Sequence, residues 1–199
     1  MHSPQHLAVD STGNVYSLGD EGSQSEDYPL LIKHSREGRA IAETLSTSNF
    51  SALPLKYAAV LGGDKGDANL FVKNDRVIVW IPLTEELFTF DLDLKLVSRV
   101  SLADAVRTML IETSMTEIRF ENLAVNSKDE VIVQVSLWSK DGRAPGLLKM
   151  ARIGADGTFK DWIESRSGER MHRFLGLTSD DKNIFLESPG NQSVKAAVQ

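Results

Sequence analysis

The chain has 199 residues and no cysteine, with 41% hydrophobic residues, 25% charged residues and a formal net charge of −6. Its length suits one domain or part of a larger one, and its composition is typical of a globular protein. Without cysteine, the chain has neither a disulfide framework nor a thiolate zinc site. Its acidic balance argues against broad contact with nucleic-acid phosphates, so we expect no nucleic-acid partner.

The sequence carries no recognisable targeting or membrane signal. Residues 1–6 lack the basic and apolar regions of a signal peptide. No segment approaches the ~18 consecutive apolar residues that a membrane-spanning helix needs, so we expect no membrane partner. The cellular compartment stays open, and a periplasmic or secreted location is favoured if the chain is part of a longer protein.

A repeated phrase divides the chain into four units. The sequence reads HLAVDSTGNVY from His6, NLFVKNDRVIV from Asn69, NLAVNSKDEVI from Asn122 and FLGLTSDDKNIF from Phe174. The matching leucines at positions 7, 70, 123 and 175 are 63, 53 and 52 residues apart. This spacing indicates four copies of one structural unit, of which the copy at Asn69 is the loosest.

The first unit, over residues 5–45, is expected to form two successive hairpins. A short apolar strand ends at Val9, and the polar residues that follow suit a turn because Gly13 tolerates a positive φ. The second hairpin is expected to have strands at residues 30–34 and 39–45. Two such hairpins in succession make a four-stranded antiparallel meander.

The second unit, over residues 55–100, repeats this pattern and leads into a helix. Its second hairpin is expected to have strands at residues 87–91 and 95–100. The apolar residues near 102–112 have helical spacing, and Ser101 with Asp104 has the spacing of a capping box. This inserted helix is expected either to pack against the edge of a unit or to cover one mouth of a central channel.

The third unit, over residues 118–163, has expected outer strands at residues 147–153 and 158–163, and the fourth, over residues 172–199, is incomplete. A four-stranded meander of this length is typical of a propeller blade. The sequence therefore predicts an all-β fold, a β-propeller of about four blade-like units with one short helix. A β-sandwich with similarly spaced hairpins is the alternative.

Residues 7–16, which read LAVDSTGNVY, resemble the signature of NHL-type repeats and related six-bladed propellers, and residues 122–135 are a weaker match. The resemblance implies a larger six-bladed propeller of which this chain supplies about four blades, or half of an assembly closed by another chain. Such propellers are binding platforms, lactone or ester hydrolases, or sensor and secreted domains of bacterial proteins.

Open faces on the first and last units would favour self-association. Those faces would include Leu7, Val9, Leu175, Leu177 and Ile184.

Candidate ligand-binding residues lie in two places. The hydrolase branch of the resemblance implies oxygen ligands around a central divalent cation such as Ca²⁺, at the ends of inner strands. The side chains at such positions are Asp10, Asn69, Asn122 and Asn126. Turn formation is the favoured explanation of Asp10 and Asn126. A basic cluster of Arg170, His172 and Arg173 suits an anionic ligand, with a solvated loop as the favoured alternative.

The sequence contains no recognisable catalytic set. The four histidines are scattered without metal-ligand spacing, and the Gly-x-Ser-x-Gly pattern of serine hydrolases does not occur. We therefore expect a non-catalytic β-propeller scaffold that binds a protein or a small molecule and needs no cofactor. The alternative is part of a metal-dependent lactonase or esterase-type propeller hydrolase.

Overall fold

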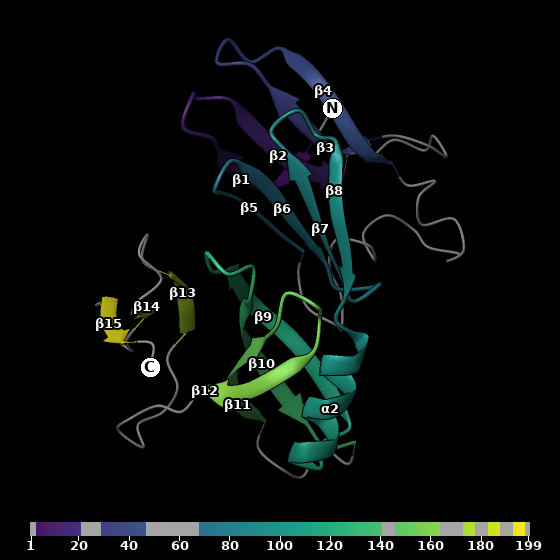
Figure 1. The fold of residues 1–199 in the computed structure, drawn as a ribbon, viewed down its shortest axis with the longest axis vertical. Helices are drawn as coiled ribbons and strands as arrows, with labels where there is room; N and C mark the ends of the chain where they lie inside the picture. The colour runs from purple at the N-terminus through teal and green to yellow at the C-terminus, as the bar shows by residue number, and fades with distance from the viewer. Residues whose placement is uncertain are drawn as a thin grey trace. The chain divides into compact units, whose positions relative to one another are not determined.

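Among the residues that the structure describes, the chain forms antiparallel β-sheets, and a helix follows the second sheet and precedes the third in the sequence (Figure 1). The computed structural model describes residues 3–20, 29–46, 68–140, 146–163, 173–177, 183–187 and 193–197. The chain divides into two compact units, Met1–Gly63 with Asp67–Arg99, and Asp64–Gly66 with Val100–Gln199.

Two four-stranded sheets occupy the first unit, and in each the strand order follows the chain order. The first sheet consists of β1 (Ser3–Val9), β2 (Val15–Asp20), β3 (Pro29–His34) and β4 (Ala40–Ser46). The second consists of β5 (Asn69–Lys73), β6 (Arg76–Ile81), β7 (Glu86–Asp91) and β8 (Leu96–Ser101), whose last two residues belong to the second unit. These are the two meanders that the sequence predicts.

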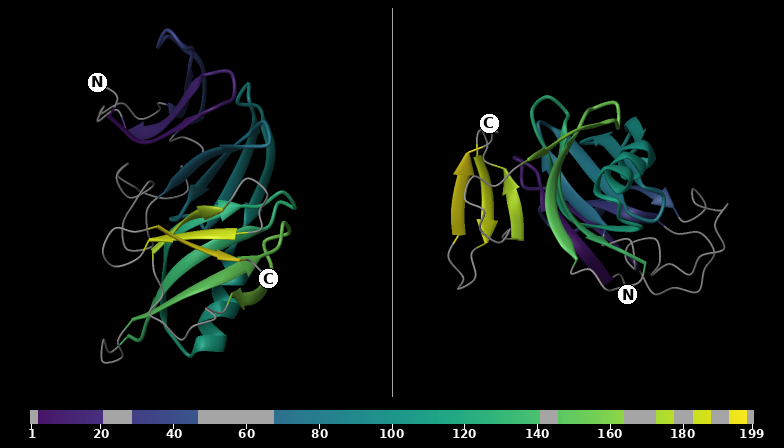
Figure 2. Two further views of the ribbon diagram at one scale, coloured as in Figure 1. Left: turned by 90° about the vertical axis from the view of Figure 1, so that its left-hand side faces the viewer. Right: turned by 90° about the horizontal axis from the view of Figure 1, so that it is seen from below.

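The second unit holds a further meander and a three-stranded sheet. The third sheet consists of β9 (Glu117–Val125), β10 (Val131–Trp138), β11 (Leu147–Ile153) and β12 (Phe159–Ile163). The strands β13 (Arg173–Leu177), β14 (Asn183–Glu187) and β15 (Ser193–Ala197) lie side by side (Figure 2). The predicted all-β fold of blade-like antiparallel units is confirmed, and the last unit has three strands within the described residues. The extent of these units as domains stays a prediction.

Five of the hairpins share one turn geometry. In each, the first turn residue donates its backbone N–H to the carbonyl oxygen four residues on and accepts from the N–H three residues on. The residue three positions after the first has a positive φ, as Gly13 does at 88° and Asp129 at 60°. The first residues of these turns are Asp10, Ser35, Asp91, Asn126 and Gly154.

The β5–β6 turn differs from this geometry, although its sequence was expected to be a copy. Lys73 pairs directly with Arg76, so only Asn74 and Asp75 form the turn, with φ of 50° and 55°. Two positive φ values in a two-residue turn suit the right-handed twist of the flanking strands. The loosest sequence copy is therefore also a different turn.

The first and second sheets of the first unit pack face to face. Tyr16, Leu18 and Leu31 of the first sheet share one apolar core with residues of the second, including Val79 and Phe90. In β6 all five residues from Val77 to Ile81 are buried, so both faces of this strand are covered. A strand whose two faces are both buried is continuously apolar in sequence, and β6 reads Val-Ile-Val-Trp-Ile over these five residues.

In the second unit, the sheet that contains β13 packs on the third sheet. Leu177 packs against a core of Ile132 and Met150, together with Ala124 and Ile163. The expectation that Leu177 lies on an open face is therefore wrong, because its side chain faces the third sheet. The side chains of Leu175 and Ile184 lie outside the described part of the structure.

The predicted helix is present as α2 (Ala103–Thr113) and contacts β9 and β12, the two edge strands of the third sheet. Leu102, Val106 and Met109 are buried. The predicted capping box is wrong: Leu102 is the N-cap without a side-chain cap, since Ser101 still belongs to β8. Among the described residues, no helix is long and apolar enough to cross a membrane.

Candidate functional site

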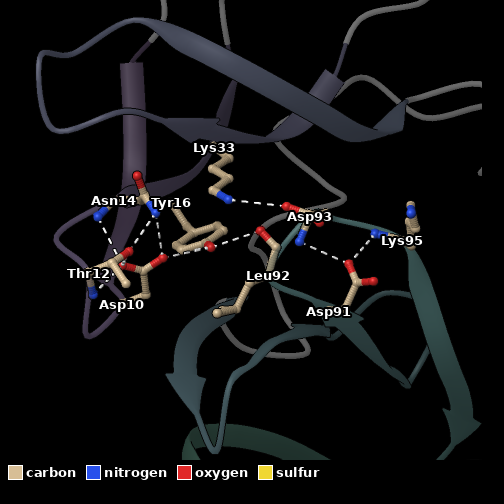
Figure 3. Close-up of polar contacts among 9 residues, drawn as sticks. All are labelled: Asp10, Thr12, Asn14, Tyr16, Lys33, Asp91, Leu92, Asp93 and Lys95. Atoms are coloured by element: carbon tan, nitrogen blue, oxygen red, sulfur yellow. Dashed lines mark hydrogen bonds and ion pairs between the residues drawn. The ribbon is translucent and has the colours of Figure 1, made fainter.

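A dense polar cluster in the described part of the first unit surrounds Asp10, directly after β1 (Figure 3). One carboxylate oxygen, Oδ1, accepts the backbone N–H groups of Thr12 and Asn14, both at 2.9 Å, and the Thr12 hydroxyl at 2.7 Å. The other, Oδ2, accepts from Asn14 Nδ2 at 2.9 Å and lies 3.1 Å from the Tyr16 hydroxyl. Because a carboxylate offers about four lone-pair sites, these five contacts occupy it fully.

Burial and hydrogen bonding act in opposite directions on Asp10. Burial alone would raise the pKa of this carboxyl, which is only 7% exposed. The hydrogen bonds from Asn14, Thr12 and Tyr16 outweigh burial and hold the pKa well below its usual value. Burial, and then the hydrogen bond to Asp10, raise the pKa of Tyr16 well above its usual value. The pair is therefore a stable carboxylate with a neutral phenol, without a group poised to exchange protons near neutral pH.

The same cluster ties the first sheet to the second. The Tyr16 hydroxyl lies 3.0 Å from the carbonyl oxygen of Leu92, in the turn between β7 and β8. Lys33 Nζ lies 3.5 Å from a carboxylate oxygen of Asp93 in that turn and 5.9 Å from the centre of the Tyr16 ring. Lys33 is itself buried. We call Asp10, Thr12, Asn14, Tyr16, Lys33 and Asp93 the Asp10 cluster.

Two other turns repeat the Asp10 geometry. Asn126 Oδ1 accepts the backbone N–H groups of Lys128 and Glu130, both at 2.9 Å, and Asn126 Nδ2 donates to Glu130 Oε2 at 2.8 Å. In this turn the amide side chain is at the first position and the carboxylate at the fifth, the reverse of Asp10 and Asn14. Asp91 Oδ1 likewise accepts from the N–H groups two and four residues on, at 2.9 Å each. The favoured interpretation of Asp10 and Asn126 as turn formers agrees with these contacts.

The other candidate residues lie elsewhere in the two units. Asn69 begins β5 opposite Trp80, in the same unit as Asp10. Asn122 lies within β9 opposite the buried Gln134, and its Oδ1 accepts the N–H of Leu123 at 2.9 Å. Arg173 begins β13, while Arg170 and His172 lie outside the described residues. No group of three or more His, Asp or Glu side chains that could hold a metal ion occurs in the part of the chain that the structure describes.

Sequence reasoning missed Tyr16, Lys33, Asp91 and Asp93 as members of this network. Asp91 could have been found, because it is an aspartate at the end of an apolar strand and begins a turn, as Asp10 does. The approach of Tyr16 to Leu92 joins residues 76 positions apart, and no local pattern predicts it.

No family model matches the chain, and no curated protein matches it. A protein of unknown function from Bacteroides caccae is similar in structure, with 10% identity and a TM-score of 0.47, over 98% of this chain and 61% of that one. A chain of the mitotic checkpoint complex is similar with 9% identity and a TM-score of 0.45, over 96% of this chain and 45% of that one. The chain thus spans less than two thirds of each. With TM-scores below 0.5, neither likeness carries an argument about fold or function.

Proposed function

We propose that this chain is a non-catalytic scaffold, part of a six-bladed propeller of the NHL type, that binds a protein or a small molecule. The observation that carries the proposal is that polar side chains at the strand ends accept hydrogen bonds from the backbone of their own turns. Asp10 and Asn126, which a propeller hydrolase would offer to a cation, are engaged in closing their own hairpins. Their contacts stabilise the hairpins from which the sheets are built.

A calcium ion at Asp10 would compete with the fold. Calcium takes 6–8 oxygen ligands, and a carboxylate that binds it gives up lone pairs for the metal. At Asp10 those lone pairs accept the N–H groups of Thr12 and Asn14. Binding would therefore leave partly buried backbone donors without an acceptor, at a cost of about 1–3 kcal/mol for each donor. This competition favours a scaffold over the alternative metal-dependent lactonase or esterase.

Exposed apolar side chains on the first sheet support a binding role. Leu7 and Val9 of β1 are 62% and 60% exposed, and Ile41 of β4 is 54% exposed. Their neighbours Ala8 and Ala42 pack on the core with the second sheet, so alternation places these three on the reverse side. On that side Ser17 and Ile32 of the central strands are buried, so the exposed groups follow the two edges. We call this side the outer face of the first sheet.

Calcium titration tests the proposal. We expect millimolar Ca²⁺ to leave the melting temperature of the wild-type chain unchanged, because a ligand stabilises only as far as it binds the native state. Isothermal titration should show no saturable heat. The Asp10→Asn variant tests the predicted ligand, and Asp91→Asn is a matched control in a turn of the same geometry. A rise of several degrees with wild type and Asp91→Asn, lost in Asp10→Asn, would support the hydrolase instead.

A further inference from the structure

We draw no further inference here: the strongest candidate, the exposed apolar row of Leu7, Val9 and Ile41 on the outer face of the first sheet, already belongs to the proposed scaffold, and nothing in the structure shows what covers it.

Discussion

Gly157 and Gly38 occupy the same place in two hairpin turns, with φ of 82° and 81°, but their surroundings differ. A Cβ atom at position 157 would collide with the backbone oxygen of Ser101 and lie 3.0 Å from Val100 Cγ1. A Cβ atom at position 38 would meet nothing within 4 Å. Position 157 therefore needs glycine both for its positive φ and for lack of space, whereas position 38 needs it only for its positive φ.

This difference predicts unequal losses on substitution by alanine. Gly38→Ala should lower the free energy of unfolding by about 1–2 kcal/mol, the cost of a left-handed backbone conformation for an L-residue. Gly157→Ala should lower it by clearly more, because the main chain at Ser101 must also move. Urea unfolding of both variants beside the wild type measures the difference. Equal losses would mean that the turn and β8 do not approach as closely as described.

Asp10 gives the stability of the chain a defined pH dependence. Its pKa is lower in the folded chain than in the unfolded one, so its carboxylate contributes stability above the unfolded pKa, near 4. That contribution is lost as the pH falls from there towards the lower folded pKa. The variant Asp10→Asn lacks the ionised acceptor at every pH, and its amide group would oppose the donors of Asn14 and Tyr16.

We therefore expect Asp10→Asn to cost about 1–3 kcal/mol at pH 7, the cost of leaving a buried hydrogen-bonding group without its partner. The gap to the wild type should narrow as the pH falls below about 4. Chemical denaturation at pH 7 and pH 3 measures both gaps. Asp93→Asn serves as the control, because its side chain is 75% exposed and its ion pair with Lys33 is partly screened. A gap for Asp10→Asn that stays constant with pH would contradict the role assigned to its carboxylate.

At the scale of the element, the strand register places Val133 at the centre of the third sheet. It lies in β10 opposite Leu123 of β9 and Ala151 of β11, and it is fully buried. Val133→Asp would bury a carboxylate among apolar neighbours, so we expect a loss of several kcal/mol or failure to fold. Val97→Asp, at a half-exposed valine of β8, is the matched control and should change stability little. Thermal melts of the two variants decide, and similar melting temperatures would mean that the register of β10 is wrong.

Hairpins were predictable because their information is local. A polar residue such as Asp10 followed three positions later by Gly13 specifies the turn, and apolar strands flank it. Leu94 and Asp129 occupy the same left-handed position without glycine, so the turn imposes this conformation against the preference of the residue. The helix was found from its spacing, but its cap was not, because Ser101 is the last residue of β8 and Leu102 takes the N-cap position.

Contacts between sheets could not be predicted from the sequence. The copies of the repeat indicate that similar sheets follow one another, but not which side chains meet across them. Tyr16 and Lys33 contact a turn that lies about sixty or more positions further along the chain. Leu177 packs on the third sheet, although the local sequence pattern of the last unit is equally consistent with an open face at that position. Such non-local contacts depend on how the blades stack, which a pattern within one blade does not encode.

At the scale of the whole molecule, each unit contains a pair of sheets that bury apolar faces against one another. The first sheet packs on the second, and the sheet of β13 packs on the third. A propeller continues this stacking until its ring closes, because an uncovered apolar face favours association. On the outer face of the first sheet, Leu7, Val9 and Ile41 at the two edges are more than half exposed, while Ser17 and Ile32 between them are buried.

We therefore expect the isolated chain to self-associate in a concentration-dependent way. Replacing Leu7, Val9 and Ile41 together by serine should shift it towards a monomer, since the change removes exposed apolar surface that association would bury. Replacing Leu96 and Val97, which are similarly exposed on β8 of the second sheet, is the control and should leave association unchanged. Size-exclusion chromatography with light scattering measures both. A sharp wild-type monomer of 22.0 kDa with a cooperative melt would mean that the outer face needs no partner and that the chain is not an open part of a larger ring.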